Sequence, residues 1–217
     1  MSRPTSALAA ATLGATLLGA SATGAQLTVE GFVGTAFNVP TPLTIRQEGA
    51  TPLRFTARYS TRPFRDAPYY ALRLATGDGA HGWAADFVHH KLYLENPPPE
   101  VQRFEISHGF NMLSAGPWWS RRSLRFGASV GVVIAHPESR VRNRPLAGRR
   151  GLFGRGYYLA GVTFQGLVGR RFELGSRYFT SLEGRLTGSY VRVPVAGGMA
   201  AVPNLAVHTL AGLGATY

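Results

Sequence analysis

The sequence predicts an all-β protein, a small antiparallel transmembrane β-barrel of eight strands that is preceded by a cleaved signal peptide. Three observations predict it. From residue 26 onward, apolar and polar residues alternate with a period of two, which is the pattern of a strand with two different faces. The alternating segments run for roughly ten residues or more, the length that a tilted membrane strand needs. Aromatic residues gather near the segment ends, as in interfacial girdles: Trp83, Tyr93, Trp118, Trp119, Tyr157 and Tyr190.

The alternation by itself fits two architectures. In a soluble β-sandwich the apolar face is the core, whereas in a membrane barrel the apolar face meets lipid and the polar face lines the lumen. Segment length and aromatic ends favour the barrel. The last segment adds to this, because its apolar residues share one face with the terminal Tyr217. Such an ending is similar to the C-terminal signal through which bacterial outer-membrane barrels engage their assembly machinery, although those proteins usually end in Phe.

The first 25 residues predict a secretory signal peptide. Arg3 is followed by an apolar stretch over residues 7–20 and then by small residues, with cleavage expected after Ala25. The alternative is a transmembrane anchor, but the stretch is short, rich in glycine and lacks a basic stop flank. We therefore expect residues 26–217 to form a single barrel domain in the outer membrane of a Gram-negative cell.

Composition narrows the classes of function. The 217 residues include no cysteine, which excludes a disulfide scaffold, a zinc–thiolate site, a thiolate nucleophile and an iron–sulfur cluster. The formal net charge is +12, and Lys91 is the one lysine beside 22 arginines. That charge suits anionic lipid or lipopolysaccharide, and the arginine excess also fits a bias in genomic base composition. Nucleic acid is not an expected partner, because no nucleic-acid motif accompanies the charge.

Nine segments have the strand pattern, whereas bacterial barrels typically have an even number of strands. Eight are expected to span the membrane. The nine segments are 27–38, 52–60, 67–75, 82–94, 101–113, 123–134, 156–169, 175–193 and 204–217.

Counting strands back from a periplasmic C-terminus orients the connections. Segments 95–100, 135–155 and 194–203 are predicted to be extracellular loops. Segments 76–81 and 114–122 are predicted to be periplasmic turns, and the count breaks around 39–51.

The polar chemistry concentrates between residues 81 and 112, in two segments joined by the proline-rich loop 95–100. Placing Leu94 opposite Val101 predicts a hairpin register that pairs His90 with Glu105 on the polar face. The side chains then expected in the lumen are Asp86, His90, Arg103, Glu105, Ser107 and Asn111. Those expected to point outward are His89, Lys91 and His108, among Phe87, Phe104, Ile106 and Phe110.

An enzyme that acts on lipid needs its acid–base residues where lipid reaches them, and histidine serves near neutral pH. The candidate catalytic residues are Asp86, His89, Glu105, His108 and Asn111. Two alternatives stay open. His89 and Lys91 also fit polar residues at the headgroup level, and His90 with Glu105 also fits a salt bridge in the lumen.

A set of two histidines and a carboxylate for a divalent metal could be drawn from His89, His90, His108 and either Glu105 or Asp86. The strand pleat separates His90 from the other two histidines, so the metal is left unassigned.

The loop from His136 to Arg155 is the second candidate site. Arginine binds phosphate through a planar fork of donors, and a cluster of arginines suits an anionic glycolipid. The expected lipid A phosphate ligands are Arg140, Arg142, Arg144, Arg149 and Arg150. A solvated basic loop is the alternative.

Three stretches resemble the lipid A oxidase-like family of outer-membrane β-barrels: Ala67-Pro-Tyr-Tyr-Ala-Leu-Arg-Leu, Gly82-Trp-Ala-Ala-Asp-Phe-Val-His-His-Lys-Leu-Tyr93 and Phe104-Glu-Ile-Ser-His-Gly-Phe-Asn-Met-Leu113. The resemblance covers roughly residues 67–137. By position, Asp86, His89 and Lys91 match one family motif, and Glu105, Gly109 and Asn111 match another. His108 departs from the oxidase itself, which has Asp at that place.

The resemblance implies oxidation of the proximal glucosamine of lipid A to 2-aminogluconate. Molecular oxygen would be the co-substrate and hydrogen peroxide the second product. The expected function is therefore an enzyme or binder acting on lipid A, with outer-membrane lipid and lipopolysaccharide as partners. The alternatives are a non-enzymatic structural or adhesive barrel, a narrow pore, and a lipid A deacylase, for which the serine of the His-x-Ser-Asn element is missing after His108.

Overall fold

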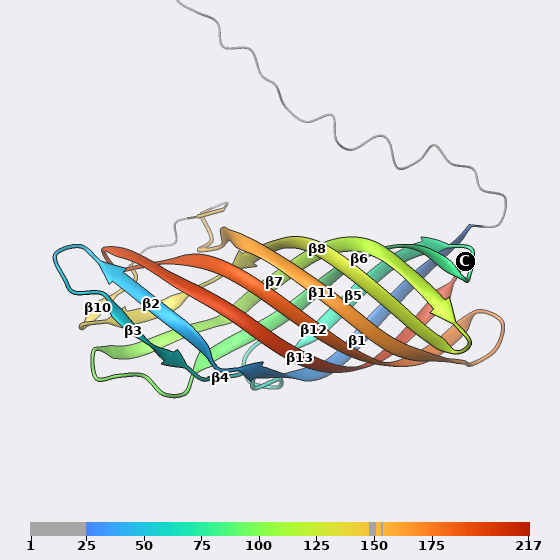
Figure 1. Ribbon diagram of the computed structural model, residues 1–217, viewed down its shortest axis with the longest axis horizontal. Helices are drawn as coiled ribbons and strands as arrows, with labels where there is room; N and C mark the ends of the chain where they lie inside the picture. Colours follow the sequence, from blue (N-terminus) through green and yellow to red (C-terminus); the bar gives the residue numbers. More distant parts are fainter. Residues whose placement is uncertain (1–24, 148–150, 153) are drawn as a thin grey trace, which may run out of the picture.

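The computed structural model describes residues 25–147, 151–152 and 154–217, and these form an antiparallel all-β structure (Figure 1). The predicted signal peptide lies outside the described residues except for Ala25. Eight strands close into a ring: β1 (Gln26–Val39), β5 (Tyr70–Gly77), β6 (His81–Leu94), β7 (Val101–Arg121), β8 (Leu124–Ala135), β11 (Tyr158–Glu173), β12 (Tyr178–Val195) and β13 (Gly198–Thr216).

Pairing of the first and last strands closes the ring. Each of the eight strands pairs with its neighbour in the order β1, β5, β6, β7, β8, β11, β12, β13, and β13 returns to β1. Main-chain hydrogen bonds join Leu27 to Tyr217 at 3.1 and 2.8 Å. Both ends of the barrel domain therefore lie at one end of the ring, which we call the terminal end. The eight-stranded barrel is the fold that the sequence predicted.

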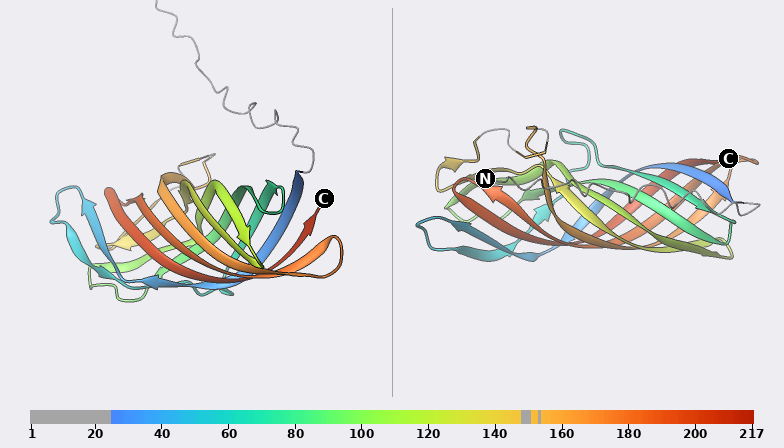
Figure 2. Two further views of the ribbon diagram at one scale, coloured as in Figure 1. Left: turned by 45° about the vertical axis from the view of Figure 1, so that its right-hand side comes forward. Right: turned by 90° about the horizontal axis from the view of Figure 1, so that it is seen from above.

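Of the nine predicted segments, 52–60 is the one that does not span the membrane. It forms β3 (Leu53–Ala57) and β4 (Tyr59–Ser60) at the opposite end of the barrel, which we call the loop end. There β2 (Thr41–Gln47) pairs with both β13 and β3, and this hairpin extends past the ring (Figure 2). On the far side, β9 (Glu138–Val141) and β10 (Arg144–Pro145) extend β7 in the same way.

Two predicted connections are strands instead. β7 continues through 114–121 to a turn at Arg122, and β12 and β13 continue through 194–203 except for a turn at 196–197. Gly116 and Pro117 lie inside β7, at the point where its pairing with β8 is interrupted. A proline has no N–H group to donate, and on the β8 side no pair at this position needs one, which explains why the strand passes through it.

The outside of the ring is apolar. Leu159 is 65% exposed, and large apolar side chains such as Phe164, Leu182 and Leu213 are exposed on neighbouring strands. A continuous apolar exterior on a closed barrel is the surface of a protein in lipid, not of one in water. Among the described residues, no helix is long and apolar enough to cross a membrane.

The terminal half of the interior is a charge cluster. Arg73 bonds Glu183 at 2.6 Å and Asp86 at 3.0 Å, and Arg185 reaches the same Asp86 at 3.1 Å. Glu30 lies 3.7 Å from Arg73. Every charge has an opposite partner, which is the condition for burying such groups.

The half toward the loop end is a hydrophobic core, although the sequence predicted a polar lumen throughout. Its members come from the ring and from the β2–β3 hairpin, and they include Leu43, Ile45, Leu92, Phe104, Ile106, Phe110, Val133 and Val193. Between the two halves, the Tyr69 hydroxyl and His208 Nδ1 form a hydrogen bond of 2.6 Å, beside His90. The described interior is therefore filled by side chains along the ring.

Candidate functional site

The β6–β7 hairpin carries the predicted site, but its register differs from the predicted one. Tyr93 lies opposite Glu105 and Leu92 opposite Ile106, and then the register shifts so that His90 lies opposite Phe110. The extra residues belong to β7, where Gly109 has a φ of +135°. This is a β-bulge, a feature that re-aims side chains and whose glycine supplies a backbone conformation rare in other residues.

The bulge and the register decide which face each residue occupies. Asp86 and His90 point into the barrel, as predicted. Phe104, Ile106 and Phe110 also point inward and join the core, although they were expected outside. The predicted lumen positions of Arg103, Glu105 and Asn111 were wrong. The Arg103 side chain is exposed, and Glu105 and Asn111 lie on the outer side with Tyr93 and His89. A register error of an odd number of residues exchanges the two faces of a strand, which is the cause.

His89 and Asn111 form a pair on the outer wall. The imidazole donates through Nδ1 to Asn111 Oδ1 at 2.7 Å and stacks on Tyr70, with ring centroids 5.2 Å apart. Nε2 is buried and has no hydrogen-bond partner among the described residues. Because Asn111 fixes the proton on Nδ1, Nε2 is left as the basic nitrogen.

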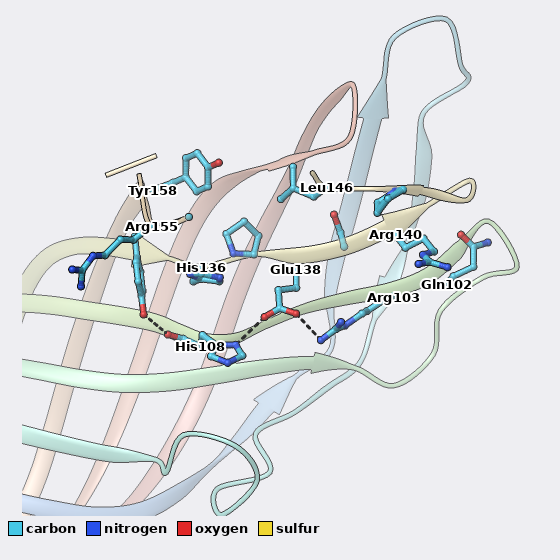
Figure 3. A pocket seen from close by; sticks show the side chains of 14 residues that line it. Gln102, Arg103, His108, His136, Glu138, Arg140, Leu146, Arg155 and Tyr158 are labelled. Carbon is cyan, nitrogen blue, oxygen red and sulfur yellow. Dashed lines mark hydrogen bonds and ion pairs between the residues drawn. The ribbon is translucent and has the colours of Figure 1, made fainter. Parts of the chain in front are cut away.

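His108 enters a different site at the rim. Its Nδ1 lies 2.9 Å from Glu138 Oε1, and Arg103 lies 2.6 Å from the other oxygen of that carboxylate (Figure 3). Tyr157 donates its hydroxyl to the His108 carbonyl at 3.2 Å. The carboxylate therefore orients the imidazole, whose side chain keeps an exposed fraction of 51%.

These residues line an open pocket of about 1020 Å³ at the loop end. Its floor is formed by β7 and β9, and residues 145–146 and 155–158 line the opposite wall (Figure 3). The charged and aromatic residues that line it are Arg103, His108, His136, Glu138, Arg140, Arg155, Tyr157 and Tyr158.

The five candidate catalytic residues do not form one site. Asp86 belongs to the interior charge cluster, His89 and Asn111 to the outer wall, and His108 to the rim pocket. Glu105 accepts hydrogen bonds from Arg103 and from Ser107 at the edge of that pocket. His90, far from pairing with Glu105, bonds Asn38 at 2.9 Å in the interior.

The arginine-rich loop contributes less than the sequence predicted. Arg140 lines the pocket, whereas Arg142 bonds Gln47 at 2.9 Å and the Thr51 carbonyl at 2.7 Å, which ties β9 to the β2–β3 hairpin. Arg144 lies in β10, and Arg149 and Arg150 lie outside the described residues.

Sequence reasoning missed Arg103, His136, Glu138, Arg155 and Tyr157 as pocket residues. The signal for four of them was present, since they lie in or beside the arginine-rich loop. Arg103 could be found only from the pairing of β7 with β9, which places it opposite Arg140.

The metal set considered from the sequence is not assembled. Within the described residues, no group of three or more His, Asp or Glu side chains is placed to hold a metal ion. His90 and His89 lie on opposite faces of β6, as the pleat requires.

No protein-family model matches the chain, and no curated protein matches it. Among solved structures, it is similar to Ail, the attachment invasion locus protein of Yersinia pestis in complex with the heparin analogue sucrose octasulfate (12% identity, 89% of this chain and 99% of that chain, TM-score 0.37). It is also similar to the outer membrane protein OprG from Pseudomonas aeruginosa (10%, 89% and 96%, TM-score 0.46) and the outer membrane protein AlkL (12%, 100% and 96%, TM-score 0.46). The barrel itself is established by the strand pairing.

Proposed function

We propose that this protein is an outer-membrane β-barrel that binds the phosphorylated headgroup of lipid A at the rim pocket. The observation that carries the proposal is the pocket itself, which joins three arginines to an oriented His–Glu pair on the outer side of the barrel wall. The barrel is oriented with its loop end outside the cell and its terminal end in the periplasm, after removal of residues 1–25. β13 is the strand offered to the assembly machinery.

The position of the pocket supports a lipid headgroup as its ligand. Leu159 is part of the exposed apolar exterior, and the two residues before it, Tyr157 and Tyr158, already line the pocket. The pocket therefore begins where the apolar exterior ends, at the level of phosphates in the outer leaflet. Guanidinium groups bind such phosphates through paired donors.

Binding is tested with the purified barrel in phosphatidylcholine vesicles that contain lipid A. Replacing Arg140 by Ala removes a charged hydrogen-bond donor worth ~1.5–3 kcal/mol, so affinity for lipid A should fall about 10- to 100-fold. Arg54→Ala removes an exposed arginine of β3 outside the pocket and should leave affinity unchanged. Equal affinity of all three proteins would contradict the assignment of the pocket.

A second proposal, which the His108–Glu138 contact favours, is that the bound headgroup is also modified. Glu138 orients the His108 ring, so that the imidazole can accept a proton from a sugar hydroxyl. In the oxidation that the family resemblance implies, the hydroxyl carbon of the reducing sugar loses two electrons to molecular oxygen. Oxygen then leaves as hydrogen peroxide, and water completes the acid.

Mass spectra of lipid A from a Gram-negative host expressing the protein test this activity. A strain with 1-dephosphorylated lipid A is included, since oxidation requires a free reducing end. One added oxygen that disappears with His108→Ala is the expected result, and loss of an acyl chain would instead indicate a deacylase. Unchanged lipid A in both strains, with a correctly folded barrel, would leave a binding or structural barrel and exclude the proposed modification there.

A further inference from the structure

A loop at the loop end displays one large apolar side chain to the outside. Residues 62–67 lie within the connection between β4 and β5, and Phe64 among them is 89% exposed. This loop is held firmly, and the contacts that hold it come from the outer face of β6.

Lys91 is the main anchor. Its side chain points outward from β6 and is nevertheless 0% exposed, because the 62–67 loop covers it. The ammonium group donates to the carbonyls of Arg62 at 2.8 Å, Arg65 at 2.5 Å and Ala67 at 2.6 Å. All three donors of the lysine are thus used on one short stretch of main chain, which offsets the cost of burying the charge.

Tyr93 is the second anchor. Its hydroxyl donates to Asp66 Oδ2 at 2.8 Å, and the guanidinium groups of Arg62 and Arg65 lie 4.9 and 5.6 Å from its ring centre. Arg62 and Asp66 have positive φ values of 46° and 55°, which non-glycine residues rarely adopt. Such a conformation persists where surrounding contacts impose it, so the position of Phe64 is fixed rather than incidental.

The height of the loop on the barrel follows from β6. Trp83 near the terminal end and Tyr93 beneath the loop are ten residues apart on this strand. Ten residues cover roughly 33 Å along a strand, or about 25 Å along the axis of a barrel whose strands tilt by about 40°. The apolar band of such barrels is about 25 Å tall. Phe64 therefore lies at the outer boundary of the band.

The surroundings of the loop fit lipid better than a protein partner. Directly toward the terminal end, the outer wall continues with Tyr70, Phe87 and the exposed Leu72, so Phe64 extends a surface that already faces acyl chains. Arg62 forms an ion pair with Glu95, with a nitrogen–oxygen distance of 2.8 Å. Arg65 has a side chain that is 60% exposed, lies 3.7 Å from Asp66 and remains open to a ligand.

We propose that the 62–67 loop is a rigid lipid contact, in which Phe64 inserts among the acyl chains of the outer leaflet while Arg65 pairs with a lipid phosphate. The loop lies beside the rim pocket, because Tyr93 beneath the loop is paired with Glu105, which accepts a hydrogen bond from Arg103 of the pocket. The inference rests on the proposed membrane location and deepens it. The acyl chains of a bound lipid contact the 62–67 loop, and its headgroup binds in the rim pocket on the same wall of the barrel.

The absence of cysteine from the chain makes the test direct, since Phe64→Cys creates a unique labelling site. A nitroxide at position 64 is compared in phosphatidylcholine vesicles with and without lipid A. Its relaxation by oxygen, which concentrates in lipid, is measured against relaxation by a water-soluble nickel chelate. Leu72→Cys is the lipid-facing control, and Glu48→Cys, exposed in the turn between β2 and β3, is the aqueous control.

The expected result is that position 64 behaves like position 72, with oxygen access several-fold above nickel access. An effect of lipid A beyond that of phosphatidylcholine identifies the ligand of Arg65 as lipid A phosphate, and it should vanish with Arg65→Gln. If position 64 behaves like position 48 while position 72 lies in lipid, the inference is overturned and the membrane location stands. If position 72 is also aqueous, the proposed location itself fails.

A second pair of variants tests the anchoring. Lys91→Met keeps the length of the side chain and removes its three donors, so the label at position 64 should become more mobile and more accessible to nickel. Tyr93→Phe removes only the bond to Asp66 and should act in the same direction by less, which keeps the test valid if Lys91→Met does not fold. An unchanged spectrum in both variants contradicts a fixed loop.

Discussion

Arg185 shows how single residues hold the interior together. Its side chain is fully buried, bonds Glu183 and Asp86, and lies 4.8 Å from the Phe32 ring centre. Removing one partner of a buried ion pair costs about 3–5 kcal/mol, because the remaining charge is left uncompensated. Arg73 still contacts both carboxylates, so Arg185→Leu should lower the free energy of unfolding by an amount near the lower end, about 3 kcal/mol.

Urea unfolding of the reconstituted barrel, followed by tryptophan fluorescence, measures this loss. Arg54→Ala is the matched control, since its guanidinium is exposed, and it should change the unfolding free energy by less than ~0.5 kcal/mol. A loss for Arg185→Leu no larger than that of the control would show that the cluster does not stabilise the barrel.

At the scale of elements, the bulge in β7 controls where the Asn111 side chain lies relative to His89. A Cβ atom at Gly109 would lie 2.3 Å from Asn111 Nδ2, and the φ of +135° is strained for any other residue. Gly109→Ala should therefore displace Asn111 from His89 and lower stability by ~1–3 kcal/mol. Gly188→Ala is the control, because a Cβ there meets no heavy atom within 4 Å. The urea midpoint of unfolding measures the loss of stability, and the ¹⁵N chemical shift of His89 Nδ1 measures the displacement of Asn111.

The 62–67 loop has its own pH dependence. The pKa of Asp66 is lowered, chiefly by the hydrogen bond from Tyr93 and further by the nearby charges of Arg65, His108 and Lys91. A lowered pKa means that the bond is present above the ordinary pKa of Asp and is lost as pH falls through the lowered value. The mobility of a label at position 64 should be constant through neutral and mildly acidic pH and rise only at lower pH. Tyr93→Phe should remove that low-pH rise, and a rise near pH 6 would contradict the assignment.

The elements also show what the sequence could and could not predict. The alternation in 52–60 was real, because Leu53 and Phe55 pack on the core. Alternation does not reveal whether an apolar face meets lipid or a protein core, so the sequence could not show which of the nine segments lies beyond the ring. The hairpin register failed for a related reason: Gly109 was a visible sign of a bulge, but the number of residues a bulge absorbs is set by tertiary pairing.

For the whole molecule, the filled interior predicts the absence of a pore. The charge cluster, the His90–Tyr69–His208 layer and the core lie along the barrel axis, and an eight-stranded barrel has room for little beyond its side chains. In planar bilayers the protein should give no unitary conductance steps above those of a detergent blank. Reproducible steps of one size would contradict the packed interior and favour the narrow pore considered from the sequence.

The burial of Lys91 gives the molecule a built-in chemical reporter. It is the chain's one lysine, so an amine-reactive ester has a single side-chain target, and that target is sealed by the three carbonyls of the 62–67 loop. The rate of acylation of the Lys91 amine therefore measures how often the 62–67 loop opens in the unsubstituted protein. Its rate compared with that of global unfolding would show whether the loop opens by itself within the membrane or only when the barrel is lost.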